Sequence, residues 1–360
     1  MVKTASANVP QKTVISGTID SETITSETQL RKIIKAYPKM LDKRILSDLD
    51  THCLEFIRCS KLAVLALAGE EVGFHLIHAS RDLKVGSPNE LLLQNLKDYQ
   101  NNAKPDKRYA SLYFLAPGLG HALRVNGYLD AAENDRSSDA SLSKRFYVTQ
   151  AYVHCARAAA RSQLWSPMER IPPFDENRIK AADSLSEYLS YASYALLKTH
   201  NQKWQTEVSP RGDQTGFLTL IEENVIFLPE RPGNKVAVSL RNILQNPSVE
   251  LLCMIPGCEL VLLLSGRAQI TSDADLCAKA AVDGKLPKLG ILIKVTSYTL
   301  VQASVLKDMS LWDQADYVSK GEVTPFPKVL SEHMNGRGLL GKATNQVVKA
   351  VVNHDMKHLY

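Results

Sequence analysis

Two short runs in the second half of the 360-residue chain carry residues that could bind an anion. Residues 209–213 read S-P-R-G-D after an extended stretch, and residues 231–235 read R-P-G-N-K before a periodic run. Arginine presents a planar fork that matches phosphate oxygens, and glycine lets backbone N–H groups approach a ligand. A helix N-terminus adds unpaired N–H donors. These runs predict a phosphate pocket; the alternative is two ordinary turns, with Arg211 paired to Asp213 at the surface.

The predicted phosphate-binding residues come from these runs and from the helix expected after them. Ser239 and Arg241 are two residues apart and cannot share one helix face, so only one of them is expected to reach the phosphate. The charge of Asp213 opposes an anion, and we expect its carboxylate to orient Arg211 or to cap a turn. The full set is Ser209, Arg211, Gly212, Asp213, Gly233, Asn234, Lys235, Ser239 and Arg241.

Three motifs in order resemble the FMN-binding split-barrel flavoproteins related to pyridoxamine 5′-phosphate oxidase. They are V-S-P-R-G-D at 208–213, R-P-G-N-K at 231–235 and S-L-R-N-I-L at 239–244. In that family two barrels pair, and each flavin lies in the groove between them. The resemblance implies an α+β, mainly antiparallel fold of two tandem split β-barrels with peripheral helices, arranged as an intramolecular pseudo-dimer. It also implies FMN as the cofactor and a flavin-dependent oxidoreductase activity, with no catalytic residue identified.

The hydrophobic pattern independently favours an antiparallel β-barrel, because short strands occur without a β-α-β rhythm. Capping boxes at 26–29 and 87–90 predict helix starts, the second leading through Leu96. Further helices are expected at 155–164, 176–189 and 300–309. The predicted strands are 62–68, 72–79, 111–116, 121–129, 146–153, 191–199, 204–208, 217–221, 225–228, 249–255, 260–270 and 289–298.

Four segments are expected along the chain. Residues 1–23 are predicted to be a flexible tail, and 24–167 a first barrel with a degenerate phosphate site. A proline-containing linker at 166–174 leads to a second barrel, 175–316, which keeps the motifs. Residues 317–360 form a C-terminal helical extension that packs on the barrels or serves an intermolecular contact.

The two halves repeat one another. Leu115–Gly118 matches Met254–Gly257, and Val148–Trp165 aligns without gaps with Val295–Trp312. Two of the 3 tryptophans therefore share one slot, which indicates a tandem duplication. The phosphate elements of the first half are reduced to Ser80–Asp82 and Lys84–Gly86, and the counterpart of the hairpin at 217–228 is expected to be largely missing there.

The motifs of the resembled family are divided between the two halves, and neither half holds the full set. This distribution predicts one surviving site between the halves. The second half supplies the phosphate pocket, and Arg161 and Trp165, four apart on a helix, flank the flavin ring from the first. His154 and Arg124 are further candidates. The alternatives are that Trp165 is a core anchor, as Trp312 is expected to be, and that His154 is an ordinary structural histidine.

Composition narrows the remaining possibilities. A net charge of +5, dispersed along the chain, argues against nucleic-acid binding. The 6 cysteines include no C-x-x-C pair, so neither a zinc site nor a redox dithiol is predicted. No apolar run approaches membrane-spanning length, and we expect a soluble, cytoplasmic monomer or homodimer. The expected partners are a small-molecule substrate and NADH or NADPH. The alternative function is a non-catalytic flavin-, deazaflavin- or haem-binding protein.

Overall fold

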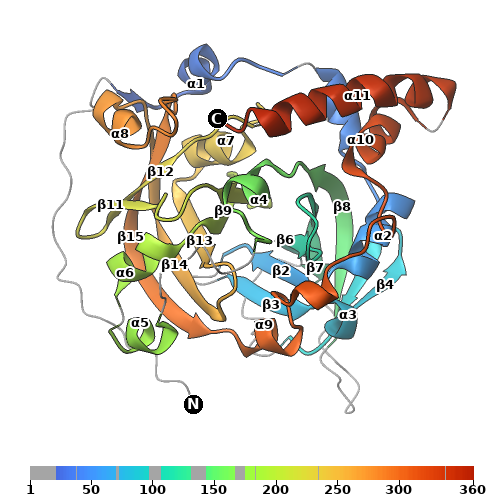
Figure 1. Cartoon of the computed structure of the whole chain (residues 1–360), viewed down its shortest axis with the longest axis horizontal. Helices are drawn as coiled ribbons and strands as arrows, with labels where there is room; N and C mark the ends of the chain where they lie inside the picture. The colour runs from blue at the N-terminus through green and yellow to red at the C-terminus, as the bar shows by residue number, and fades with distance from the viewer. Residues whose placement is uncertain are drawn as a thin grey trace.

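The computed structural model describes residues 22–37, 39–69, 73–96, 107–130, 143–166, 175–182, 184–233, 235–336 and 338–360. These residues form two antiparallel sheets that lie side by side, with helices around them (Figure 1). The α+β, mainly antiparallel fold class is confirmed. Most of the predicted tail (1–21) and of the linker (167–174) lies outside the described residues.

The first sheet has seven strands and comes from the first half of the chain. Its strands are β2 (Leu62–Leu67), β3 (Phe74–His78), β4 (Leu83–Ser87), β5 (Glu90–Leu93), β6 (Lys107–Leu115), β7 (Ala122–Asp130) and β8 (Lys144–His154). They are ordered β3-β2-β6-β7-β8-β5-β4. The end strands contribute Ile77 and Leu83 to one core with Leu112 of the inner strand β6, so the sheet curls around that core.

The second sheet repeats this order. Its strands are β9 (Tyr194–His200), β10 (Thr206–Gly212), β11 (Thr219–Glu222), β12 (Val225–Pro229), β13 (Ser248–Met254), β14 (Leu260–Thr271) and β15 (Gly290–Gln302). They are ordered β10-β9-β13-β14-β15-β12-β11, and β1 (Thr23–Ile24) pairs with β14 as an eighth strand. The last residues of the predicted tail are therefore part of the sheet.

Two strand assignments differ from the sequence predictions. The helix expected from Ser87 through Leu96 is instead the β4–β5 hairpin, because Leu91 and Leu93 alternate into the core and β5 pairs with β8. This hairpin holds the same place in its sheet as β11–β12, so the expectation that the hairpin is largely missing from the first half was wrong. The S-P-R-G run lies within β10, an edge strand, where a proline is tolerated.

The helices surround the two sheets. They are α1 (Glu27–Ile33), α2 (Thr51–Cys59), α3 (Ala79–Asp82), α4 (Arg157–Arg161), α5 (Glu176–Ala182), α6 (Leu185–Tyr191), α7 (Val238–Gln245), α8 (Ala274–Lys279), α9 (Ser304–Asp308), α10 (Phe326–Asn335) and α11 (Leu339–Lys357), with short 3₁₀ turns η1 (Lys39–Arg44) and η3 (Gln314–Asp316). The helix predicted at 176–189 is two helices. The one predicted from residue 300 begins at Ser304, because Leu300 still pairs with Leu262 in the sheet. None of the helices in the described ranges combines the length and apolarity that a bilayer crossing requires.

A third apolar layer joins the sheets. In β2, Ala63 and Leu65 face the inner core, whereas Leu62 and Val64 face outward into a cluster shared with Leu196 of β9. Both faces of β2 are thus buried, which explains its uninterrupted apolar sequence. The Tyr113 and Tyr194 hydroxyls meet across this layer at 3.1 Å.

Local contacts repeat between the halves. The Trp165 indole donates to the carbonyl of Leu119 (2.6 Å), and the Trp312 indole donates to that of Cys258 (3.0 Å). The two rings lie 5.6 Å apart, in the layer between the sheets. Gly127 and Gly266 each mark an irregularity in strand register, and a Cβ there would collide with the carbonyl of the neighbouring strand.

Strand β10 crosses α4 at very short range, and this crossing joins the halves beside the S-P-R-G-D run. A Cβ on Gly212 would lie 2.1 Å from the carbonyl oxygen of Ala158. Glycine is therefore required here by the packing of β10 against the first half.

Replacing Gly212 with Ala should lower the free energy of unfolding by about 1–3 kcal/mol, because β10 and α4 must move apart. Gly233→Ala is the matched control, since the nearest atom to its added Cβ lies 3.9 Å away. Urea denaturation measures both variants. Equal stability of the two would show that the close crossing is not required.

Candidate functional site

A cavity of about 1270 Å³ lies between the two sheets, on the side of β10 and α7. Strands β7 and β8 and helix α4 of the first half form one wall, and β10, the loop after β12 and the start of α7 form the other. Arg211, Lys235 and Arg161 all line it, so the structure brings these predicted residues together. Trp165, which was predicted to flank the flavin ring, does not line the cavity and packs against Trp312 instead.

The cavity concentrates positive charge. Among the described residues that line it, eleven are Lys or Arg and four are Asp or Glu. This excess is larger than the net charge of +5 of the whole chain. The lining therefore favours an anionic ligand.

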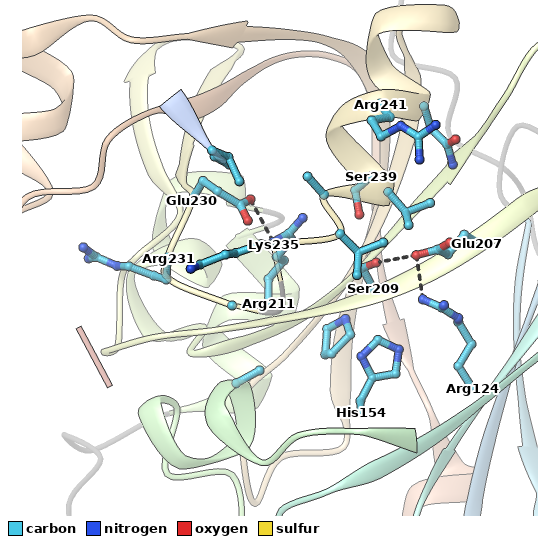
Figure 2. A pocket seen from close by; sticks show the side chains of 18 of the residues that line it. Arg124, His154, Glu207, Ser209, Arg211, Glu230, Arg231, Lys235, Ser239 and Arg241 are labelled. Carbon is cyan, nitrogen blue, oxygen red and sulfur yellow. Dashed lines mark hydrogen bonds and ion pairs between the residues drawn. The ribbon is translucent and has the colours of Figure 1, made fainter. Parts of the chain in front are cut away.

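Arg211 lines the cavity, and its guanidinium pairs with Glu230 at 2.8 Å (Figure 2). Its Nε is buried without a hydrogen-bond partner. Asp213, which was expected to orient Arg211 or cap a turn, instead forms an ion pair with Arg231, whose side chain extends away from Arg211. The alternative Arg211–Asp213 pair is therefore not formed. Instead, Arg211 pairs with Glu230 and Asp213 pairs with Arg231, and both pairs join the end of β10 to the loop after β12.

That loop has an unusual backbone. Lys235 and Ala237 adopt left-handed conformations (φ 61° and 56°), and α7 starts only at Val238. Gly233 precedes the helix by five residues, so it does not form its N-terminus as predicted, and Asn234 lies outside the described residues. Arg31 of α1 holds the loop by donating to the carbonyls of Lys235 (3.0 Å) and Val236 (3.2 Å).

The N-terminus of α7 has no side-chain cap. Its N-cap residue is Ala237, and residues 236–239 line the cavity. The first N–H groups of a helix need partners from outside the helix. An anion in the cavity would supply such partners.

Ser239 and Arg241 both line the cavity, although the side chains differ in environment. Ser239 is buried, whereas Arg241 is partly exposed and pairs with Glu27 of α1 at 3.0 Å. Ser239 is therefore the better placed of the two to meet a ligand inside the cavity.

The wall of the first half carries a buried ion pair. Arg124 of β7 donates to Glu207 of β10 at 2.6 Å, and the Ser209 hydroxyl donates to the same carboxylate (Figure 2). The Arg124 guanidinium also lies 5.1 Å from the centre of the Tyr152 ring. This pair ties β7 to β10 across the cavity.

His154, at the end of β8, is 7% exposed and lines the cavity. Its ring lies edge-on to Tyr152, and its Nε2 has no hydrogen-bond partner. Burial, followed by the positive charges of Arg124, Arg44 and Arg211, lowers the pKa of His154 well below its usual value. The imidazole is therefore neutral at physiological pH and can offer one donor and one acceptor nitrogen.

Arg161 is held by the chain itself. Its Nε donates to the carbonyl of Leu359 at 2.7 Å, and its Nη2 donates to that of Pro232 at 2.6 Å. Burial and the neighbouring Arg157 lower its pKa to about 10. Arg161 thus braces the loop after β12 and the C-terminal segment, rather than presenting a free guanidinium.

Three positions on the opposite side that correspond to Arg211, Arg124 and His154 carry apolar residues. Leu62 pairs with His78 and Leu115 in the first sheet, just as Tyr194 pairs with Gly212 and Met254 in the second. The residue before His78 is Ile77 and the residue before Gly212 is Arg211, so Ile77 stands at the position that corresponds to Arg211. The expectation that Ser80–Asp82 corresponds to S-P-R-G-D was therefore wrong. Leu263 and Val301, which stand where Arg124 and His154 do, pack in the layer between the sheets.

Sequence reasoning missed Glu207, Glu230, Arg31 and Tyr360. The two glutamates adjoin the motifs, and an acidic residue beside a predicted phosphate ligand could have signalled an ion pair. Tyr360 donates to Asp213 at 2.6 Å from 147 positions away, and no spacing rule reaches so far.

No family model and no curated protein matches the chain. Similar solved structures each cover about a third of it. HupZ from Group A Streptococcus is 17% identical, with 36% of this chain and 96% of that chain covered and a TM-score of 0.27. An F420 reductase is 17% identical, covering 32% and 97%, with a TM-score of 0.25. A Clostridium acetobutylicum protein of the pyridoxinephosphate oxidase family is 13% identical, covering 36% and 91%, with a TM-score of 0.27.

The neutral state of His154 predicts a pH dependence. An unfolded histidine binds a proton below pH ~6.5, whereas folded His154 does not, so the free energy of unfolding should fall as the pH drops from 7 to 5. His154→Gln should remove at most about 2 kcal/mol of that fall. Denaturant titrations at both pH values measure it, and an unchanged slope in the variant would contradict a neutral His154.

Proposed function

We propose that this protein is a flavin-dependent oxidoreductase that binds one FMN in the cavity between its two sheets. The single observation that carries the proposal is that the uncapped start of α7, Arg211 and Lys235 share one cavity with the aromatic wall of β8. A phosphate-bearing ligand with a flat ring needs both kinds of wall. The wall that carries Arg211 and Lys235 would by itself support only a general anion site.

The phosphate end of the ligand would meet the second half. Arg211 has an unpartnered Nε, Ser239 is buried at the first turn of α7, and Lys235 projects from the loop before it. These groups supply a guanidinium, a hydroxyl, an ammonium and helix N–H donors, which together suit a phosphate. Asp213 and Arg161 already have partners, and we assign them to holding the loops.

The ring would lie toward the first half. Tyr152 and His154 line that side, and Arg124 lies against the Tyr152 ring. Flat aromatic and imidazole groups pack against a ring system and leave polar atoms free for its edge. Trp165 takes no part, since its partly buried indole packs beside Trp312 and donates a hydrogen bond to the Leu119 carbonyl.

The repeated strand order, the paired tryptophan contacts and the matching glycines support a tandem duplication of one split-barrel unit. Residues 24–167 and 175–316 would then be the two units, with 317–360 as an extension. Ile77, Leu263 and Val301, at the corresponding positions on the opposite side, offer no group that binds an anion, so we propose one site per chain.

FMN, when bound, would carry hydride or electron transfer, while the protein binds and orients it. NADH or NADPH is the electron donor that we propose to test first, with a small-molecule substrate as acceptor. The alternative that the same lining would suit is a protein that binds the flavin without catalysis.

Absorbance titration of the purified chain with FMN tests the proposal. We expect saturation at one FMN per chain, with flavin bands that bleach anaerobically on adding NADH or NADPH. Bound FMN that no donor reduces would indicate a non-catalytic binding protein. A Soret band in the purified protein, tight binding of a deazaflavin alone, or no binding at all would contradict the FMN assignment.

Replacing Arg211 with Ala should weaken FMN binding roughly 10- to 100-fold, because a charge-assisted hydrogen bond to the phosphate is lost. Arg178→Ala is the matched control, since Arg178 is also paired with a glutamate (Glu187) but lies outside the cavity. Fluorescence titration gives both dissociation constants. Equal values in wild type and the Arg211 variant would remove Arg211 from the site.

A further inference from the structure

The C-terminal segment reaches the cavity beside the two motif loops. After α11 the chain turns inward, and the Tyr360 side chain comes between Arg161 and Arg231, whose guanidinium carbons lie 5.6 and 5.1 Å from its ring centre. Its hydroxyl donates to Asp213 at 2.6 Å. In Figure 1 the red C-terminal helix runs across the top of the molecule toward α7.

Several contacts hold this segment in place. Asp355 pairs with Arg157 at 2.9 Å, Leu359 accepts from Arg161 at 2.7 Å, and Lys285 donates to the Tyr360 carbonyl at 3.2 Å. Arg157 and Arg161 belong to α4 of the first half, whereas Lys285 belongs to the second. The segment therefore contacts both walls at one end of the cavity.

Tyr360 bears directly on the predicted phosphate pocket through Asp213. This carboxylate ends the S-P-R-G-D run and pairs with Arg231, which begins the R-P-G-N-K run. Asp213 is only 1% exposed, so its second oxygen needs a donor from the protein. The Tyr360 hydroxyl supplies that donor together with the Gln214 N–H (2.8 Å).

The protonation state of the Tyr360 hydroxyl suits its role as a hydrogen-bond donor to Asp213. Burial and the hydrogen bond to Asp213 raise the pKa of Tyr360 above its usual value. The hydroxyl consequently keeps its proton and remains a donor throughout the physiological pH range.

We propose that Tyr360 is a positioning residue of the anion pocket, which couples docking of the C-terminal segment to the geometry of the two motif loops. It acts through the Asp213–Arg231 pair and needs no contact with the ligand. Where this pocket binds FMN, as proposed above, the coupling is reciprocal: FMN stabilises the docked segment, and the docked segment strengthens FMN binding by the same factor.

The first test uses the free protein and needs no ligand. Hydrogen exchange is compared between wild type, Tyr360→Phe and the control Tyr317→Phe, which also loses one hydroxyl donor (to the Trp165 carbonyl, 3.2 Å) but lies outside the cavity lining. We expect exchange of residues 213–217 and 231–237 to rise at least severalfold in Tyr360→Phe only. Unchanged exchange there overturns the proposal, whether or not FMN binds.

The second test adds FMN. We expect Tyr360→Phe to weaken FMN binding about 3- to 10-fold and Tyr317→Phe less than twofold. FMN should also slow exchange in residues 339–360 of wild type, and less so in Tyr360→Phe, an effect that a general loss of stability would not produce. If the wild-type protein binds FMN but exchange in residues 339–360 does not slow, the reciprocal coupling is overturned, while the positioning role of Tyr360 is still decided by the first test. Wild type that binds no FMN overturns the proposed function, and the first test then decides on Tyr360 separately.

Discussion

The apolar layer between the two sheets is the constraint on which the cavity depends. Leu62 and Val64 of β2 and Leu196 of β9 pack there with residues of both halves, and burial of such area is the main favourable contribution to folding. The layer fixes how closely β10 can approach α4, where only a glycine fits. Because β10 carries Arg211 and β8 carries His154, the same packing sets the width of the cavity between them. The site is thus positioned by side chains that never touch it.

Ion pairs within the cavity lining determine which charged groups remain free to bind a ligand. Glu207, Glu230 and Asp213 each bind one arginine, and these pairs connect β7 to β10 and β10 to the following loop. A buried pair contributes little net stability, because desolvation offsets the attraction, although it does fix geometry. Among the described lining residues, the Arg211 Nε, Lys235 and the uncapped start of α7 are positive groups that these pairs do not use. The acidic residues hold the cavity in shape, and the unpaired positive groups define what it can bind.

Local sequence patterns predicted the mainly antiparallel fold and the shared location of Arg211, Lys235 and Arg161. They failed where tertiary packing overrides a local signal. The capping box at Ser87 is as good as that at Ser26, yet pairing of β5 with β8 makes the following residues a strand. Trp165 and Arg161 share a helix spacing, but the short helix α4 ends at Arg161, and the tryptophan turns into the layer between the sheets. The contacts of Asp213 with Arg231 and Tyr360 join residues far apart in sequence, which periodicity cannot detect.

Both walls of the cavity belong to one polypeptide. In a site built between separate subunits, dilution separates the walls, and apparent stability depends on protein concentration. Here the covalent connection keeps the partner wall at a high effective concentration, so the groove assembles as a first-order event and persists at any dilution. The covalent connection also allows the two sheets to differ in sequence at corresponding positions. Arg211 can therefore stand in one sheet while Ile77 stands at the corresponding position of the other, a difference that two identical subunits could not have.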